Sequence, residues 1–131
     1  MNFKFVCMAA AAAWVASAAG ALAADAAAGE TLFNQKCKVC HQVGETAKNF
    51  VGPELNGVIG RKAASAADYA YSDAMKASGL TWDEATFKEF LAGPKAKVAG
   101  TKMIFAGLPK ETDRDNIAAY LAQFDASGKK K

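Results

Sequence analysis

The stretch Cys37-Lys38-Val39-Cys40-His41 governs the interpretation of this 131-residue chain. Its two cysteines and the histidine that follows form C-x-x-C-H, the attachment pattern for c-type haem. Residues three apart on a helix share a face, so both thiols can bond to the two vinyl groups of one haem. The imidazole then lies under the iron and can ligate it. We expect one covalently bound haem c per chain, with Cys37 and Cys40 as attachment sites and His41 as a ligand.

Other uses of two closely spaced cysteines fit the sequence less well. A structural zinc site needs four ligands, mostly Cys and His, and His41 is the only histidine. A thioredoxin-like pair belongs beside a β-α-β pattern, and no stretch alternates as a half-buried strand would. A plain disulfide remains an alternative, but it leaves His41 without a role.

The iron needs a sixth ligand or an open position. Without a second histidine, thioether sulfur is the soft ligand that remains. Outside the first 24 residues, the methionines are Met75 and Met103. Met75 lies in a predicted helix, where methionine is usually part of the core, whereas Met103 lies in the loop 98–105. We assign the ligand to Met103 and keep Met75 as the rival.

Residues 1–24 are typical of a secretory signal peptide. Lys4 supplies the positive start, residues 5–19 are apolar, and Ala21-Leu22-Ala23 matches an A-x-A cleavage site. We expect cleavage after Ala23 or Ala24, which discards Cys7 and leaves a domain of residues 25–131. An uncleaved membrane anchor is the alternative, since the run is nearly long enough to span a bilayer.

The remaining sequence predicts an all-α fold of short helices and long loops. Asp25 is a candidate N-cap for a helix over 26–40, and a short helix follows at 72–78. Thr81 and Glu84 form a capping box for a helix that ends at Gly93-Pro94. A last helix begins at Thr112, with Asp115 three residues on as a weaker version of the same capping box, and it places an apolar stripe on one face. We expect loops over 41–69 and 95–110 and a frayed basic tail over 126–131.

Charge and core size limit the function classes. Loss of residues 1–24 removes one lysine and no acid, which lowers the formal net charge from +3 to +2. This charge does not by itself indicate a nucleic-acid partner. The long loops leave few large apolar side chains for a protein core, and a large apolar cofactor would complete it.

Further motifs follow C-x-x-C-H in a fixed order. They are Gly52-Pro53-x-Leu55-x-Gly57-x-x-Gly60-Arg61, Tyr71-Ser72-Asp73-Ala74, Gly79-Leu80-Thr81-Trp82, Pro94-Lys95, Gly100-Thr101-Lys102-Met103-Ile104-Phe105-Ala106-Gly107 and Ile117-Ala118-Ala119-Tyr120-Leu121. With this order, the chain resembles class I cytochromes c of the short, mitochondrial-like cytochrome c2 type. The resemblance runs from about Gly29 to Phe124 and implies that fold around one haem.

The resemblance also implies residue roles. The Pro53 carbonyl should accept a hydrogen bond from His41, and Thr101 should belong to the cofactor site. Arg61, Tyr71 and Trp82 should hold a haem propionate. Gly29 and Phe33 should meet Tyr120 and Leu121 where the terminal helices cross. Phe90 and Met75 stand where the family usually has Tyr and Asn, so we expect a less polar pocket there.

With both axial positions filled, no substrate can reach the iron, and the resemblance implies a soluble periplasmic electron carrier. A cytochrome bc1 complex is the expected donor, and a photosynthetic reaction centre or terminal oxidase the acceptor. We expect a monomer that docks on acidic surfaces through five lysines near the attachment motif and the Met103 loop: Lys36, Lys38, Lys95, Lys97 and Lys102. A haem enzyme or sensor with an exchangeable sixth ligand is the alternative.

Overall fold

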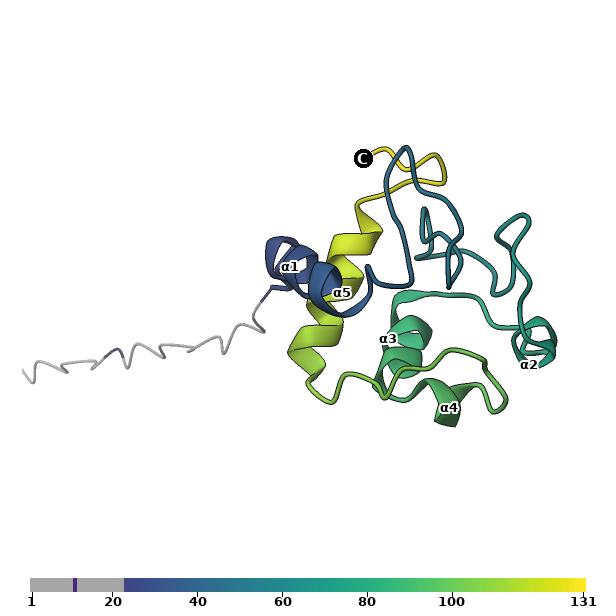
Figure 1. Ribbon diagram of the computed structural model, residues 1–131. Coiled ribbons are helices and arrows are strands. Elements are labelled where there is room, and N and C mark those ends of the chain that lie inside the picture. Colours follow the sequence, from purple (N-terminus) through teal and green to yellow (C-terminus); the bar gives the residue numbers. More distant parts are fainter. Residues whose placement is uncertain (1–10, 12–22) are drawn as a thin grey trace, which may run out of the picture.

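The computed structural model describes residue 11 and residues 23–131. The rest of the predicted signal peptide lies outside the described residues, so its boundaries remain a prediction. The described part contains the helices α1 (Ala26–Lys36), α2 (Asp73–Ala77), α3 (Glu84–Ala92), α4 (Pro94–Lys97) and α5 (Glu111–Ala122) (Figure 1). Within it, β structure is limited to isolated bridges between Lys62 and Thr81 and between Phe124 and Lys130. The all-α prediction is confirmed.

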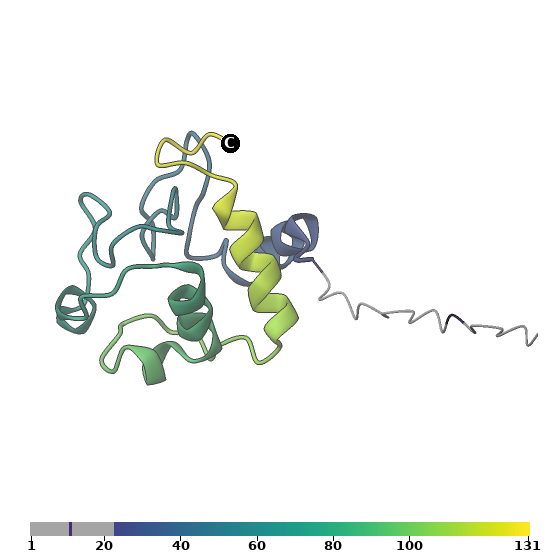
Figure 2. The same cartoon turned by 180° about the vertical axis from the view of Figure 1, so that it is seen from behind.

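The terminal helices α1 and α5 cross in direct contact, as both views show (Figures 1 and 2). A Cβ added at Gly29 would lie 1.9 Å from the Asn116 carbonyl oxygen, so only glycine allows this approach. The rings of Phe33 and Tyr120 pack with centroids 5.5 Å apart. The predicted stripe of α5 is buried, with Ile117 and Leu121 each 1% exposed. This crossing fixes the helix that leads into the cysteine motif.

Helix α1 ends at Lys36, earlier than the predicted end at Cys40. The amides of Cys37 and Lys38 both donate to the Phe33 carbonyl, and those of Cys40 and His41 both donate to the Cys37 carbonyl. The chain therefore leaves the helix through tight turns that contain the whole motif. The two cysteines are presented by these turns and not by regular helix.

The N-cap of helix α3 lies two residues later in the chain than the N-cap of the predicted capping box. Asp83 is the N-cap, and its carboxylate accepts from the Thr86 amide at 2.7 Å. Thr81 instead takes part in the bridge to Lys62. The predicted end at Gly93 is confirmed, but Pro94 then starts the short helix α4, because its fixed φ suits a first helical position.

The remaining boundaries agree with the prediction in part. Helix α2 is confirmed, with Ser72 as N-cap. Helix α5 begins at Glu111, and its N-cap Lys110 provides no side-chain hydrogen bond, so the predicted capping box of Thr112 and Asp115 is wrong. Asp115 instead accepts a hydrogen bond from Lys88 of α3 at 2.9 Å, which ties the two helices together.

The carboxyl-terminal tail is not frayed. The Asp125 carboxylate accepts from the amides of Ser127 and Lys129, and the Lys131 amide donates to the Gln123 carbonyl. Gly128 packs so closely on Gly44 that an added Cβ would lie 2.1 Å from its carbonyl oxygen. The tail therefore covers the loop that follows the cysteine motif. No helix in the described part of the chain has the length and apolar character to cross a membrane.

Candidate cofactor site

A cavity of about 520 Å³ occupies the space between the helices and the long loops. It brings together segments that are far apart in the sequence: the cysteine motif, the loop 51–71, α2, α3 and the loop that contains Met103. Every residue predicted to bind haem or iron lies on its wall: Cys37, Cys40, His41, Pro53, Arg61, Tyr71, Trp82, Thr101 and Met103. The rest of the wall is mostly apolar and includes Phe33, Leu55, Val58, Phe87, Phe90, Leu91, Ile117 and Leu121.

His41 is held in one orientation by two neighbours. Its Nδ1 lies 2.8 Å from the Pro53 carbonyl oxygen, which can only accept, so Nδ1 carries the proton and Nε2 keeps its lone pair. A Cβ at Gly52 would lie 2.3 Å from the His41 Cε1 atom. Burial, and to a smaller extent Arg61, lower the pKa of His41 against the opposing effect of the Pro53 bond. The lowered pKa favours the neutral ring, which is the form that can ligate iron.

Cys37 and Cys40 are both half-buried and unpaired. Burial, with a smaller effect of Cys40, raises the pKa of the Cys37 thiol to about 11. Both side chains line the same cavity as His41. Among the described residues, no group of three His, Cys, Asp or Glu side chains comes together to hold a metal ion.

Both methionines of the described chain lie on the cavity wall. Met103 is half-buried, and its amide donates to the Thr101 hydroxyl at 3.3 Å. Met75 belongs to α2 and packs against the core together with Met103. Phe90, which is 6% exposed, also lines the cavity. The two positions that depart from the family pattern thus place apolar groups on this wall.

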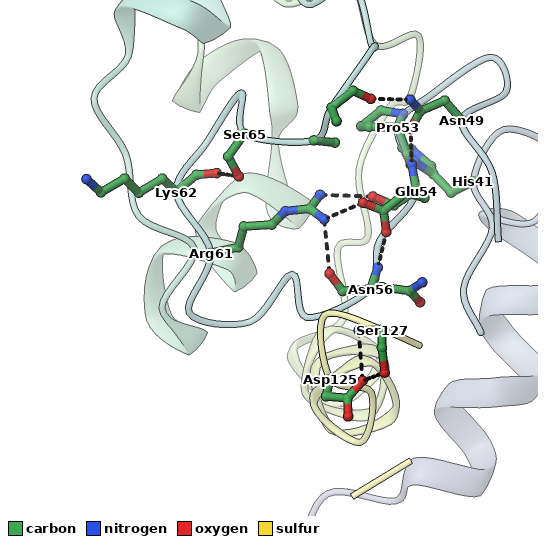
Figure 3. A network of polar contacts seen from close by, with 12 residues as sticks. His41, Asn49, Pro53, Glu54, Asn56, Arg61, Lys62, Ser65, Asp125 and Ser127 are labelled. Atoms are coloured by element: carbon green, nitrogen blue, oxygen red, sulfur yellow. Dashed lines mark hydrogen bonds and ion pairs between the residues drawn. The ribbon is translucent and has the colours of Figure 1, made fainter. Parts of the chain in front are cut away.

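Arg61 lies at the centre of a polar network beside the cavity (Figure 3). Its Nη1 donates to the Glu54 carboxylate and to the Asn56 carbonyl, both at 3.0 Å, and its Nη2 donates to the Glu54 carbonyl at 2.9 Å. The Nε–H is buried and has no hydrogen-bond partner among the residues that the structure describes. Buried donors are normally paired, so this one indicates an acceptor supplied by something other than the polypeptide.

Tyr71 and Trp82 complete the part of the wall predicted to hold a propionate. The Tyr71 hydroxyl accepts from the Ala66 amide at 3.0 Å. Burial raises the pKa of Tyr71 despite the opposing effect of that hydrogen bond and of Arg61, so the phenol keeps a proton to donate. Trp82 is 7% exposed and packs on Phe90, with ring centroids 4.9 Å apart.

The mouth of the cavity is apolar and basic. Val39, Val51 and Ile104 line the cavity and are nevertheless 71%, 61% and 96% exposed. Of the predicted docking lysines, Lys36 and Lys102 line the cavity. Lys102 donates to the Ala70 carbonyl and lies 4.5 Å from the centre of the Tyr69 ring. Lys97 is paired with Glu89 at 2.6 Å, so its charge is partly neutralised.

The residues on the wall fit haem c. Two thiols and a neutral imidazole come from one turn, and thioether sulfur comes from another segment. The apolar wall suits a macrocycle, and the unpartnered Arg61 Nε and the Tyr71 hydroxyl suit its carboxylates. The chain's own groups thus match the chemistry of each part of the cofactor.

The sequence did not predict the roles of three residues that help to form the site. Glu54 and Asn56 provide the acceptors for Arg61, and Gly52 provides the close approach to His41. Glu54 and Asn56 lie in an aperiodic loop, where no spacing rule predicts which side chains meet. The Gly52-Pro53 pair was a visible signal, since a glycine in a loop often marks a close approach.

The comparisons with known proteins agree with this geometry. The family model "Cytochrome c" matches residues 26–125. Cytochrome c-554 of Methylosinus trichosporium is 61% identical over 99% of this chain and 98% of its own length. Cytochrome c2 of Rhodoblastus acidophilus is 62% identical over 82% of this chain and all of its own length.

A solved structure gives the same result. Cytochrome cH from Methylobacterium extorquens matches with a TM-score of 0.69 and 55% identity, covering 74% of this chain and 96% of that chain. This match confirms the class I cytochrome c fold, and the cysteine motif in a family of this kind makes covalently bound haem c the prosthetic group. The chain therefore belongs to the cytochrome c family and is of the class I, cytochrome c2-like type.

Proposed function

We propose that this protein is a soluble, monomeric periplasmic carrier of single electrons, with haem c ligated by His41 and Met103. When bound, haem c supplies an iron centre that gains and loses one electron. His41 and Met103 would hold the iron, the apolar wall would exclude water, and the exposed side chains at the mouth would leave the cofactor within reach of a partner. The observation that carries the proposal is the presence of His41 and Met103 on one cavity whose mouth is lined by exposed side chains.

Two filled axial positions favour a carrier over an enzyme. A peroxidase or a ligand sensor needs an open or exchangeable iron position, and a peroxidase also needs a polar acid–base group there. The wall that contains Met103 also holds Phe90 and Met75, and none of these three side chains can donate or accept a proton. Outer-sphere transfer through the accessible edge is the chemistry that remains.

Delivery to partners depends on the mouth of the cavity. Lys36, Lys38 and Lys95 are exposed and attract acidic surfaces, while Val39, Val51 and Ile104 offer an apolar centre. Exposed lysines together with a small apolar patch suit a weak, transient complex. We propose a cytochrome bc1 complex as electron donor and a photosynthetic reaction centre or a terminal oxidase as acceptor.

Export is part of the proposal. Residues 1–24 would be removed as a signal peptide by cleavage after Ala23 or Ala24, and residues 25–131 would form the cytochrome domain. Asp25 caps α1 and its amide donates to the Asn116 side chain at 2.8 Å. Both cleavage sites keep this residue, which supports a domain boundary at this point.

An absorption spectrum of the purified holoprotein separates the candidate functions. A red-edge ferric band from methionine–iron charge transfer supports the carrier, whereas a high-spin spectrum supports an enzyme or sensor. Stopped-flow oxidation of the reduced protein by reaction centres or by a terminal oxidase then tests the partners. Slow oxidation by both, at low as well as high salt, would contradict the proposed acceptors.

A further inference from the structure

Glu54 and Arg61 form the central ion pair of the network in Figure 3. Their side chains are 25% and 17% exposed, so the pair is far less hydrated than those at the surface. The Glu54 carboxylate accepts from Arg61 at 3.0 Å and from the Asn56 amide at 2.7 Å. The carboxylate is therefore held by two donors and is itself fixed in place.

The network determines which part of Arg61 remains free. The two terminal nitrogens of the guanidinium are taken up by the Glu54 carboxylate and by the carbonyls of Glu54 and Asn56. The Nε–H has no partner in residue 11 or residues 23–131, and it belongs to a residue on the cavity wall. The contacts thus occupy the two terminal nitrogens and leave the Nε–H available for a cofactor carboxylate.

We propose that Glu54 is a positioning residue that sets the reduction potential of the haem by acting through Arg61. It holds the guanidinium in place, and its negative charge offsets the positive field of Arg61 inside the poorly hydrated site. The inference rests on the proposed cofactor-binding role of Arg61. Glu54 itself is not one of the residues that line the cavity.

The direction of the effect follows from charge. Ferric haem carries one positive charge more than ferrous haem, so a positive field nearby favours the ferrous state. In Glu54→Gln the two backbone carbonyls still hold Arg61, and the amide oxygen still offers one acceptor. The positive charge is then no longer offset, and the potential should rise. At the effective dielectric of a partly buried site, the equilibrium constant for reduction should change roughly three- to tenfold.

The test is a spectroelectrochemical titration of purified holoprotein at neutral pH and low salt. Glu54→Gln should raise the potential, Arg61→Gln should lower it, and the double variant should return close to wild type, because the pair then carries no net charge in either form. The matched control is Glu89→Gln. It removes the same charge from the exposed pair with Lys97, where Glu89 is 60% exposed, and should have little effect.

A rise in Glu54→Gln no larger than that in Glu89→Gln, or a fall, overturns the inference. If Glu54→Gln does not fold, the comparison of Arg61→Gln with the double variant measures the same charge, since removing both partners of a pair costs less than removing one. No partner protein takes part in the titration. Its result is therefore independent of whether the protein exchanges electrons with the proposed membrane complexes.

Discussion

Gly52 is the residue at which the smallest change should have the largest effect on the haem site. A Cβ at this position would lie 2.3 Å from His41 Cε1 and 2.7 Å from Nδ1. Gly52→Ala should therefore displace the His41 imidazole and break its hydrogen bond to the Pro53 carbonyl. We expect weaker axial ligation, visible as high-spin ferric absorption. Gly93→Ala is the control, because its Cβ would meet only the Ala96 Cβ at an ordinary 3.4 Å; an unchanged Gly52→Ala spectrum would contradict this view of the site.

Met103 and Met75 both face the cavity, and their substitution decides between them. We expect Met103→Ala to lose the red-edge ferric band and to lower the reduction potential, because thioether ligation favours ferrous iron. Met75→Leu keeps a similar volume and should retain the band. The reverse pattern would assign the ligand to Met75.

At the scale of residues, the cofactor-binding side chains were easier to predict from the sequence than the hydrogen-bond and ion-pair partners of individual residues. The attachment motif, the lone histidine and the two candidate methionines follow from residue type and spacing. The partners of Arg61 do not, because Glu54 and Asn56 meet it through turns of an aperiodic loop. Similarly, Lys97 seemed a free docking charge, yet Glu89, eight residues earlier and in a different helix, neutralises part of it.

Among the elements, α3 carries a cap that titrates. The amide of Thr86, and to a lesser degree its side chain, lower the pKa of Asp83 below its ordinary value of 3.8. A carboxyl group whose folded pKa is depressed stabilises the fold above the unfolded pKa, and this contribution is lost as the pH falls through the folded one. Asp83→Asn retains a capping oxygen but cannot titrate. The difference in Tm between wild type and Asp83→Asn should therefore shrink from pH 7 to pH 3.

Thr81→Ala is the matched control for that cap. The capping box predicted from the sequence would make Thr81 essential for the start of α3, whereas the structure gives that task to Asp83. Thr81→Ala should leave Tm nearly unchanged at every pH. A clear loss of Tm in Thr81→Ala would show that the predicted capping box contributes to the start of α3.

Of the contacts between helices, the crossing of α1 and α5 should tolerate substitution least. An added Cβ at Gly29 would collide with backbone atoms of Asn116, which cannot rotate away. Gly29→Ala should lower the free energy of unfolding by about 2 kcal/mol, within the usual range for overpacking. Denaturant titration of the holoprotein measures it. Ala28→Ser, at an exposed position of the same helix, should change stability by less than about 0.5 kcal/mol.

Helices were predictable where periodicity and breakers coincide, as for α2, α5 and the end of α3. Their exact starts were not, because several capping residues lie close together and tertiary contacts select among them. Thr81 forms a β-bridge with Lys62, and Asp83 is the N-cap of α3 in its place. The tail of the chain looked frayed because its composition is polar, and only the packing of Gly128 on Gly44 shows that it is held.

For the whole molecule, electrostatic steering should act through the face that contains the mouth of the cavity. Lys36 is exposed on this face, and Lys110 is exposed but does not line the cavity. Lys36→Glu should slow electron exchange with a purified cytochrome bc1 complex severalfold at low salt, and the difference should fade at high salt. Lys110→Glu makes the same charge change and should have a much smaller effect. Equal effects of both variants would indicate that only net charge matters.

The exposed apolar side chains at the mouth of the cavity affect how this protein would exchange electrons with an electrode. These side chains are Val39, Val51 and Ile104. Electron transfer to an electrode should be efficient only when the mouth of the cavity faces the electrode surface. A gold electrode coated with a mixed layer of carboxyl- and methyl-terminated thiols would present both attractions at once. A purely acidic coating would attract every exposed lysine, including those at residues 129–131, so the adsorbed molecules would take up several orientations and fewer of them would exchange electrons.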